Sequence, residues 1–386
     1  MGIHDYIDKN GGYMNYSGMN MEQVKRQNRG AILSYIVESG PVSRKEIAET
    51  TGLTPAAVTQ ICNSLLEEKI LMELGTAQSQ GVGRKKVLVD IDYDHIYIYA
   101  INIEPESVVI AVSNLKGDAK AETSFKLKGG EAPAVVLREI AKMAKEMAKE
   151  QGDLPLCGVS VAISGIVDKA EGVSVHAYGI WDEKVDVASV LEEEFQLPVI
   201  VENNVNALAY AEKLFGFGKE YENLMLIKWG PGVGSSLILH KELYEGTDRK
   251  AAELGHYIVE KDGEKCSCGR RGCLETKVSY HALSKICKFT PDTFGDALEK
   301  EEKLQDAFDL FARCIVNAIT IVSPNQVILC GSLFKDERVR KGLMEKCKYY
   351  DASIDESRIL YTGFEDKENY IGPVAAYLRE CVLYKK

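Results

Sequence analysis

The apolar positions of residues 21–72 recur at helical spacing and predict three short helices. The first helix is expected to end at Gly40, and its apolar stripe consists of Val24, Ile32, Tyr35 and Ile36. The second opens with a capping box, in which Ser43 is followed three residues later by Glu46, and it ends at Gly52.

The third predicted helix begins where Thr54 is a natural N-cap and Pro55 takes the first helical position. Its inward stripe is expected to be Val58, Ile61 and Leu65. Two short strands, around residues 70–74 and 86–91, follow and flank a polar loop. Three helices with a tight turn before the third, and then a β-hairpin, predict a winged helix-turn-helix over residues 21–90.

Beyond residue 91 the pattern changes to strands that alternate with helices, which predicts an α/β body with layered sheets. One helix is expected over residues 306–322, and another presents Val136, Ile140, Met143 and Met147 on one face. The strands are expected at residues 95–103, 107–114, 121–126, 157–163, 199–202, 224–229 and 327–329. The polar lead of residues 1–20 is expected to be poorly ordered.

The winged head predicts contacts with double-stranded DNA, because the third helix of this motif enters the major groove. Its outward side chains, which we expect to face base edges, are Thr54, Ala56, Thr59, Gln60 and Asn63. Ser43 and Arg44 suit phosphate contacts, and the loop carries the cationic tip Arg84, Lys85 and Lys86. The alternative is a protein-docking module with a solvated basic loop.

The charge of the chain restricts the kind of DNA contact. The 386 residues include 47 Lys and Arg and 58 Asp and Glu, a net charge of −11, which argues against coating nucleic acid through bulk positive charge. Residues 1–90 hold ten of each sign, so any DNA contact is expected to be local. Without a membrane-length apolar run or a secretory signal, and with only 10 cysteines, the chain is expected to be cytoplasmic.

One imidazole and three thiols lie close together in the sequence, as His256, Cys266, Cys268 and Cys273. Such a ligand set suits closed tetrahedral zinc, and four protein ligands leave no open position, which predicts a structural ion and not a catalytic one. The alternatives are three free thiols beside an unrelated histidine, or redox use of the Cys-x-Cys pair.

At these residues the chain resembles the ROK family of repressors, open reading frames and kinases. The most specific match is ELGH…CSCGRRGCLE, Glu253 to Glu275; WGPGVGSS, LPVIVENNVNALAYAE and QVKRQNRGAIL support it. The resemblance implies a sugar-responsive regulator, a homodimer or tetramer, with a two-lobed actin/hexokinase-like (ribonuclease H-like) body. Lobe 1 would comprise residues 91–205, completed by a C-terminal helix at 371–386, and lobe 2, with the zinc loop, residues 206–370.

The family pattern would place Asn203, Asn204, Glu253, His256 and Glu275 around a carbohydrate between the lobes. Carboxylates accept hydrogen bonds from sugar hydroxyls, and an amide both donates and accepts. His256 would link zinc and ligand, with one ring nitrogen toward each. The alternative is that Glu253 and Glu275 are surface acids beside a zinc loop.

Several departures from the family pattern argue against phosphoryl transfer and against ATP as a cofactor. Asn204 stands where the kinases have an aspartate general base, and an amide has no basic lone pair at neutral pH. The first nucleotide loop, residues 102–106, contains two acids and a proline, and Pro231 interrupts the second. Residues 330–332 are poor in glycine. A separate departure concerns the sugar: Ala177 stands where the family has a sugar-contacting asparagine, which leaves an unusual sugar, a sugar phosphate or a derivative open as the ligand.

The sequence thus predicts a DNA-binding transcriptional regulator, a repressor by its resemblance, whose operator affinity depends on a carbohydrate-type ligand and which is not an enzyme. Two alternatives stand beside it: a sugar kinase with an appended DNA-binding head, and a DNA-binding protein that responds to no ligand.

Overall fold

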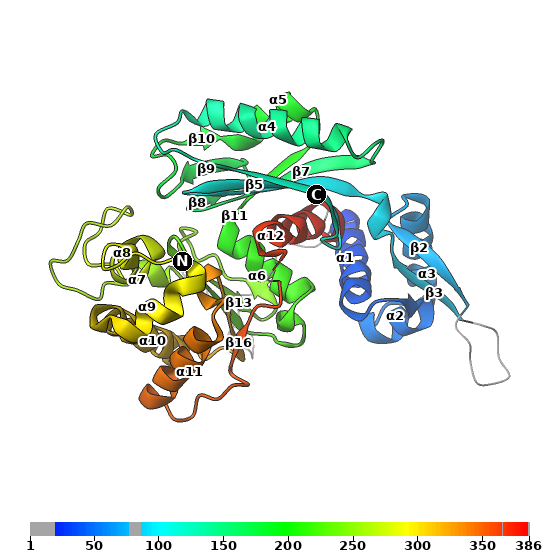
Figure 1. Cartoon of the computed structure of the whole chain (residues 1–386). Coiled ribbons are helices and arrows are strands. Elements are labelled where there is room, and N and C mark those ends of the chain that lie inside the picture. Colours follow the sequence, from blue (N-terminus) through cyan, green and yellow to red (C-terminus); the bar gives the residue numbers. More distant parts are fainter. Residues whose placement is uncertain (1–19, 77–85, 365, 385–386) are drawn as a thin grey trace, which may run out of the picture. The chain divides into compact units, whose positions relative to one another are not determined.

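The computed structural model describes residues 20–76, 86–364 and 366–384 (Figure 1). The chain forms two compact units, one made of Met1–Ile91 with Cys381–Lys386 and the other of Asp92–Glu380. Most of the lead at residues 1–20 and the loop residues Arg84 and Lys85 lie outside the described part of the chain.

The first unit contains the predicted three helices and hairpin. The helices are α1 (Met21–Ser39), α2 (Arg44–Thr51) and α3 (Pro55–Glu67), and Gly52, in the left-handed region at φ 71°, ends α2. The strands β1 (Val42–Ser43), β2 (Leu71–Thr76) and β3 (Val87–Ile91) form an antiparallel sheet in the order β1-β3-β2. The prediction of a winged helix-turn-helix is confirmed, with β1 as an additional short strand.

The core of this unit differs in detail from the expected stripes. On α3, Cys62 is buried with Val58 and Leu65, whereas Ile61 is only half-buried. On α1, Leu33 and Val37 join Ile32 and Ile36 in the core, whereas Val24 and Tyr35 are half-buried. A helix that packs against two neighbours buries a wider stripe than the single row predicted from spacing.

The end of the chain packs on α1 within the same unit. Arg26 donates a hydrogen bond of 2.7 Å from Nη2 to the carbonyl oxygen of Tyr384. Gly30 is buried, and a Cβ there would lie 3.1 Å from the carbonyl oxygen of Leu383. The absence of a side chain at Gly30 therefore lets the terminal segment approach the helix closely.

The second unit begins with a five-stranded sheet in the order β11-β7-β4-β5-β6. Part of the predicted site lies on this sheet. Strands β11, β7 and β4 are parallel, and β5 and β6 extend the sheet antiparallel. Helices α4 (Pro133–Lys149) and α5 (Val187–Phe195) pack against it and α12 (Glu368–Tyr377) also contacts it, with α4 and α12 on opposite sides in Figure 1. The strands are β4 (Tyr97–Glu104), β5 (Ser107–Asn114), β6 (Ala119–Lys126), β7 (Leu156–Ile163) and β11 (Val199–Asn203).

A second five-stranded sheet has the order β14-β13-β12-β15-β16. Trp229, at the end of β12, is fully buried and lies 4.5 Å, between ring centroids, from Phe311 of α10. Its strands are β12 (Leu224–Trp229), β13 (Val233–Leu239), β14 (Glu242–Leu243), β15 (Gln326–Cys330) and β16 (Ile359–Tyr361). The helices between β14 and β16 in the chain are α7 (Glu275–Val278), α8 (Tyr280–Ser284), α9 (Phe294–Lys300), α10 (Glu302–Val322) and α11 (Glu337–Tyr350).

Helix α6 (Asn204–Leu214) joins the two sheets, because it follows β11 and packs against both β12 and β13. It crosses α12 at Gly372, where an added Cβ would lie 3.1 Å from the amide nitrogen of Leu208. A small sheet of β8 (Ile166–Asp168), β9 (Val173–His176) and β10 (Val185–Asp186) completes the unit. The predicted fold class, a winged helix-turn-helix followed by a two-sheet body, is confirmed.

All seven expected strands of the body occur within two residues of their predicted bounds, and β4 starts two residues late, at Tyr97, because residues 93–95 form a 3₁₀ turn. Strands β8, β9, β10, β13, β14 and β16 were not predicted. Among the described residues, no helix combines the length and the apolar character needed to cross a membrane.

Candidate functional site

The ends of several strands converge on a cavity of about 570 Å³ inside the second unit. Because β4, β7 and β11 are parallel, the residues that follow their carboxyl ends meet at one edge of the sheet. Glu104, Gly165 and Asn203 line the cavity from that edge, and the glycine-rich turn of residues 230–234 lines it from the second sheet.

Asn203 is held rigidly at the start of α6. Its Oδ1 accepts hydrogen bonds from the amides of Val205 and Asn206 at 2.9 and 3.0 Å, which caps the helix. Its Nδ2 donates to the carbonyl oxygen of Gly165 at 2.7 Å. The amide that the sequence predicts as a ligand contact is therefore fixed between a helix and a strand end.

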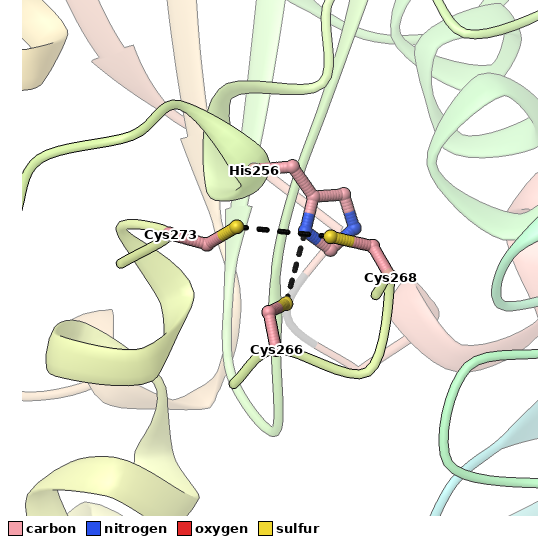
Figure 2. Close-up of side chains that lie close together, drawn as sticks. All are labelled: His256, Cys266, Cys268 and Cys273. Carbon is pink, nitrogen blue, oxygen red and sulfur yellow. Dashed lines mark hydrogen bonds between the residues drawn. The ribbon is translucent and has the colours of Figure 1, made fainter. Parts of the chain in front are cut away.

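His256, Cys266, Cys268 and Cys273 form a metal-ligand cluster (Figure 2), and His256 and Cys266 also line the cavity. Their ligand atoms all lie within 4.8 Å of one another. Cys266 Sγ lies 3.4 Å from His256 Nδ1, and Cys268 Sγ lies 3.7 Å from Cys273 Sγ. Tetrahedral zinc with its usual bond lengths needs ligand atoms about 3.5–3.8 Å apart, so this donor set fits the ion.

His256 connects the cluster to the cavity. While Nδ1 faces the thiols, Nε2 lies 3.8 Å from Glu253 Oε2 on the cavity side. Glu275 Oε1 is 3.7 Å from Nδ1 and accepts a hydrogen bond of 3.2 Å from Cys266 Sγ. Burial, together with the charge of Glu275, raises the pKa of Glu253 to about 7. The predicted residues Asn203, Asn204, Glu253, His256 and Glu275 all line this one cavity.

Tyr178 is a cavity residue that the sequence reasoning missed. Its ring lies edge-on to the ring of His256, with centroids 5.0 Å apart. The preceding Ala177 is fully buried and bridges to Trp181, so it faces the core. A tyrosine beside a buried histidine offers an aromatic surface and a hydroxyl, both of which suit a sugar ring.

Asn204 participates in a charged network that the sequence also did not reveal. Its Nδ2 donates to Ser164 Oγ at 3.0 Å and to Glu104 Oε1 at 3.4 Å. Glu104 in turn forms an ion pair with Lys228 of β12. The side-chain amide of Asn204 is therefore bonded to a carboxylate at the edge of the cavity.

A smaller cavity of about 40 Å³ shares Asn203 and Glu253 with the main one. Glu202 lines it and is 5% exposed, and its Oε1 accepts a hydrogen bond of 2.8 Å from the amide of Asn203. Burial raises the pKa of Glu202 to about 7, although Lys169 lies 3.9 Å away. The charges of Glu245 and Glu380 contribute to this raised pKa, so Glu202 carries a proton under mildly acidic conditions.

This pKa makes the stability of the second unit depend on pH. Because folding raises the pKa of Glu202, the folded state binds more protons, and stability falls as the pH rises from about 4.5 to about 7. The shift corresponds to a loss on the order of 3 kcal/mol at pH 8. We expect Glu202→Gln to stabilise the protein at pH 8 and to change little at pH 5, as measured by urea unfolding. The exposed Glu193→Gln is the control, and equal effects at both pH values would contradict the assignment.

The exposed face of α3 is the candidate DNA interface in the first unit. Thr54, Ala56, Thr59, Gln60 and Asn63 are all exposed, as predicted from the spacing. Thr54 caps the helix by accepting from the amide of Ala57 at 3.3 Å, and the Thr59 hydroxyl donates to the carbonyl oxygen of Pro55 at 2.8 Å. No hydrogen bond of the Gln60 side chain occurs among the described residues, so its amide is available to a partner.

Three predicted phosphate contacts have local partners in the structure. Ser43 is 4% exposed and its hydroxyl donates to Glu46 in the capping box, and its contact with phosphate stays a prediction. Arg44 donates to Asn63 Oδ1 at 3.2 Å and to Glu73 Oε1 at 3.1 Å. Lys86 is exposed and pairs with Glu46 at 3.3 Å.

The comparisons with known proteins match both units. Residues 98–379 match the ROK family, and residues 25–71 match a winged helix-turn-helix DNA-binding family. The chain is 29% identical over 289 residues to the xylose repressor of Bacillus spizizenii, covering 74% of this chain and 72% of that protein.

Solved structures share the fold. A ROK family transcriptional regulator, a homologue of the Escherichia coli MLC protein, superposes with a TM-score of 0.75 at 21% identity, over 94% of this chain and 97% of that one. A ROK family glucokinase from Streptomyces griseus, bound to glucose and AMPPNP, superposes with a TM-score of 0.60 at 22% identity, over 74% of this chain and all of that one. The chain belongs to the ROK family and carries an N-terminal winged helix-turn-helix.

Proposed function

We propose that this protein is a transcriptional repressor whose affinity for a DNA operator is controlled by a carbohydrate in the main cavity of its second unit. The observation that carries the proposal is the combination of an exposed α3 face with a cavity lined by Asn203, Glu253 and Glu275. The sugar-repressor name of a relative at 29% identity supports it.

The cavity offers the chemistry of a carbohydrate site. The carboxylates of Glu253 and Glu275 accept from hydroxyl groups, and His256 Nε2 is directed toward the same space. The cavity lies between the two sheets, so a bound ligand contacts both. A ligand that binds one arrangement of the sheets more tightly shifts the population toward it, and this is the route by which occupancy reaches the DNA-binding unit.

We further propose that a homodimer or tetramer acts in the cytoplasm on a two-fold symmetric operator. Two winged heads then address half-sites about 34–36 Å, or one helical turn, apart. The metal-ligand cluster would hold a structural zinc ion, because His256 and the three cysteines fill all four tetrahedral positions. The ion would hold the loop of residues 256–273 in place and would fix the ring of His256 beside the ligand.

The experiment that tests this function measures binding of the purified protein to duplexes from its own upstream region by fluorescence anisotropy. The titration is repeated with a panel of pentoses, hexoses and N-acetylhexosamines. We expect nanomolar binding to one duplex and release by one sugar class. Absence of binding to any duplex would refute the repressor, and binding that no sugar changes would favour the ligand-independent alternative.

Replacing Gln60 tests the DNA interface. A glutamine that reads adenine in the major groove contributes about 1–3 kcal/mol, so Gln60→Ala is expected to weaken specific binding by roughly 5- to 150-fold. Non-specific binding and the salt dependence should stay the same. Arg84→Ala, in the wing, should instead lower the salt slope by about one. The exposed Lys45→Ala on α2 is a control for each, and an unchanged operator affinity of Gln60→Ala would exclude α3 as the reading helix.

We propose that the protein transfers no phosphoryl group. Restoring the general base through Asn204→Asp is expected to yield no sugar-dependent ADP formation, because the new carboxylate lies beside Glu104 and Pro231 still interrupts the second loop. A coupled assay against the panel of sugars, with a ROK glucokinase as positive control, measures this. Turnover by the wild type near the 1–100 s⁻¹ of typical kinases would establish the sugar-kinase alternative instead.

A further inference from the structure

One end of the main cavity is occupied by a charge pair that belongs to the protein itself. Glu104 ends β4 of the first sheet, and Lys228 lies in β12 of the second. Their side chains form an ion pair and are only 14% and 12% exposed. Both residues line the cavity, next to Asn204.

The Oε1 atom of Glu104 accepts from three donors. Besides Lys228, it accepts from Asn102 Nδ2 at 3.1 Å and from Asn204 Nδ2 at 3.4 Å. Burial raises the pKa of Glu104, but Lys228 and the two amides outweigh it, so the pKa is lower than usual. Burial lowers the pKa of Lys228, and the charge of Glu104 outweighs it. Both groups are therefore charged at neutral pH.

The rest of the lining offers one lysine without an ion pair among the described residues, the exposed Lys265. Five glutamates and three lysines line the cavity. Lys285 is paired with Glu264 at 3.4 Å, and Lys228 with Glu104. The cavity as a whole thus has an excess of carboxylates, which repel an anion.

We infer that the Glu104–Lys228 pair makes the cavity selective for an uncharged carbohydrate and excludes its phosphate esters and nucleotides. The inference rests on the proposed function and adds the chemical class of the ligand to it. Glu104 acts here as a specificity-determining residue.

The physical reason is competition for one ammonium group. A phosphate that approached Lys228 would have to displace Glu104, which is already in place in the folded chain and needs no ordering. The displaced carboxylate would then be buried beside another anion without its main partner, which is unfavourable. A sugar hydroxyl, in contrast, donates to Glu104 or to the Asn204 carbonyl while the ion pair stays intact.

The test uses inorganic phosphate as the probe. Glu104→Gln keeps an acceptor for the neighbouring amides but leaves Lys228 as an unpaired buried cation. Isothermal titration at constant ionic strength is expected to give phosphate affinity at least tenfold higher in Glu104→Gln than in the wild type. The double variant Glu104→Gln/Lys228→Gln should return to the wild-type value.

Glu337→Gln is the matched control, because it releases Lys341 from the same type of pair at an exposed place outside the cavity, with both side chains more than half exposed. It should leave phosphate affinity unchanged. Far-UV circular dichroism establishes that each variant is folded. A folded Glu104→Gln that gains no phosphate affinity overturns the inference, and so does an equal gain in the double variant.

A second measurement needs no variant. Each sugar of the panel is compared with its phosphate ester on the wild-type protein by thermal shift. We expect the parent sugar to bind at least tenfold more tightly, and tighter binding of the ester overturns the selectivity while leaving the proposed function intact. If no sugar binds in either form but Glu104→Gln gains phosphate, the proposed function fails and the role of the pair in excluding anions stands.

Discussion

Cys268→Ser is expected to lose its zinc ion and to destabilise the second unit by more than about 4 kcal/mol. A serine hydroxyl is a far poorer zinc ligand than a thiolate, and the remaining His256, Cys266 and Cys273 do not complete a tetrahedron. Cys268 is half-buried, so the substitution itself disturbs the core little, and the loss is attributable to the metal.

Zinc content measured by mass spectrometry of dialysed protein, together with melting temperature, checks this result. The exposed Cys157→Ser is the matched control and should retain about one zinc ion per chain. Because His256 joins the cluster to the cavity, the variant should also lose its response to sugar. Full zinc occupancy in Cys268→Ser would refute the ligand set.

Glu253→Ala is expected to give a repressor that sugar no longer releases. A hydrogen bond to a charged group contributes about 1.5–3 kcal/mol, so the loss of this carboxylate should weaken sugar binding by roughly 10- to 150-fold. The side chain of Glu253 makes no capping or other hydrogen bond among the described residues, and its Oε2 lies 3.8 Å from His256 Nε2. The change therefore acts on the ligand more than on the fold.

The measurement is release of the operator duplex as the sugar concentration rises. The complex with Glu253→Ala should persist at concentrations that dissociate the wild-type complex, with the exposed Glu183→Ala behaving like the wild type. If Glu253→Ala responds at the same sugar concentration as the wild type, Glu253 lies outside the ligand site. The alternative that Glu253 is a surface acid beside the metal loop is then correct.

The features that could be predicted from the sequence are those whose residues lie close together along the chain. The metal-ligand cluster lies within eighteen residues, and the capping box of Ser43 and Glu46 within four, so both are visible as local patterns. On α3, Ile61 and Cys62 both lie three or four residues from Val58 and Leu65. Helical spacing alone does not decide between them, and packing against the neighbouring helices buries Cys62.

Interactions between residues far apart in the sequence do not appear as a local sequence pattern. Glu104 and Lys228 are 124 residues apart, and only the meeting of two sheets makes them a pair. Strand β13 escaped prediction because Ser235 and Ser236 in its middle are buried, which a pattern of apolar positions does not reveal. Tyr178 likewise acquires its place beside His256 only through tertiary structure.

The course of the last residues affects how motion passes along the chain. After α12 the backbone returns to the DNA-binding unit. There its last described residues contact Arg26 and Gly30 of α1. Two peptide tethers, one near residue 91 and one near residue 381, therefore connect the units instead of a single flexible hinge. Any movement of one unit relative to the other must therefore be accommodated at both crossings of the chain.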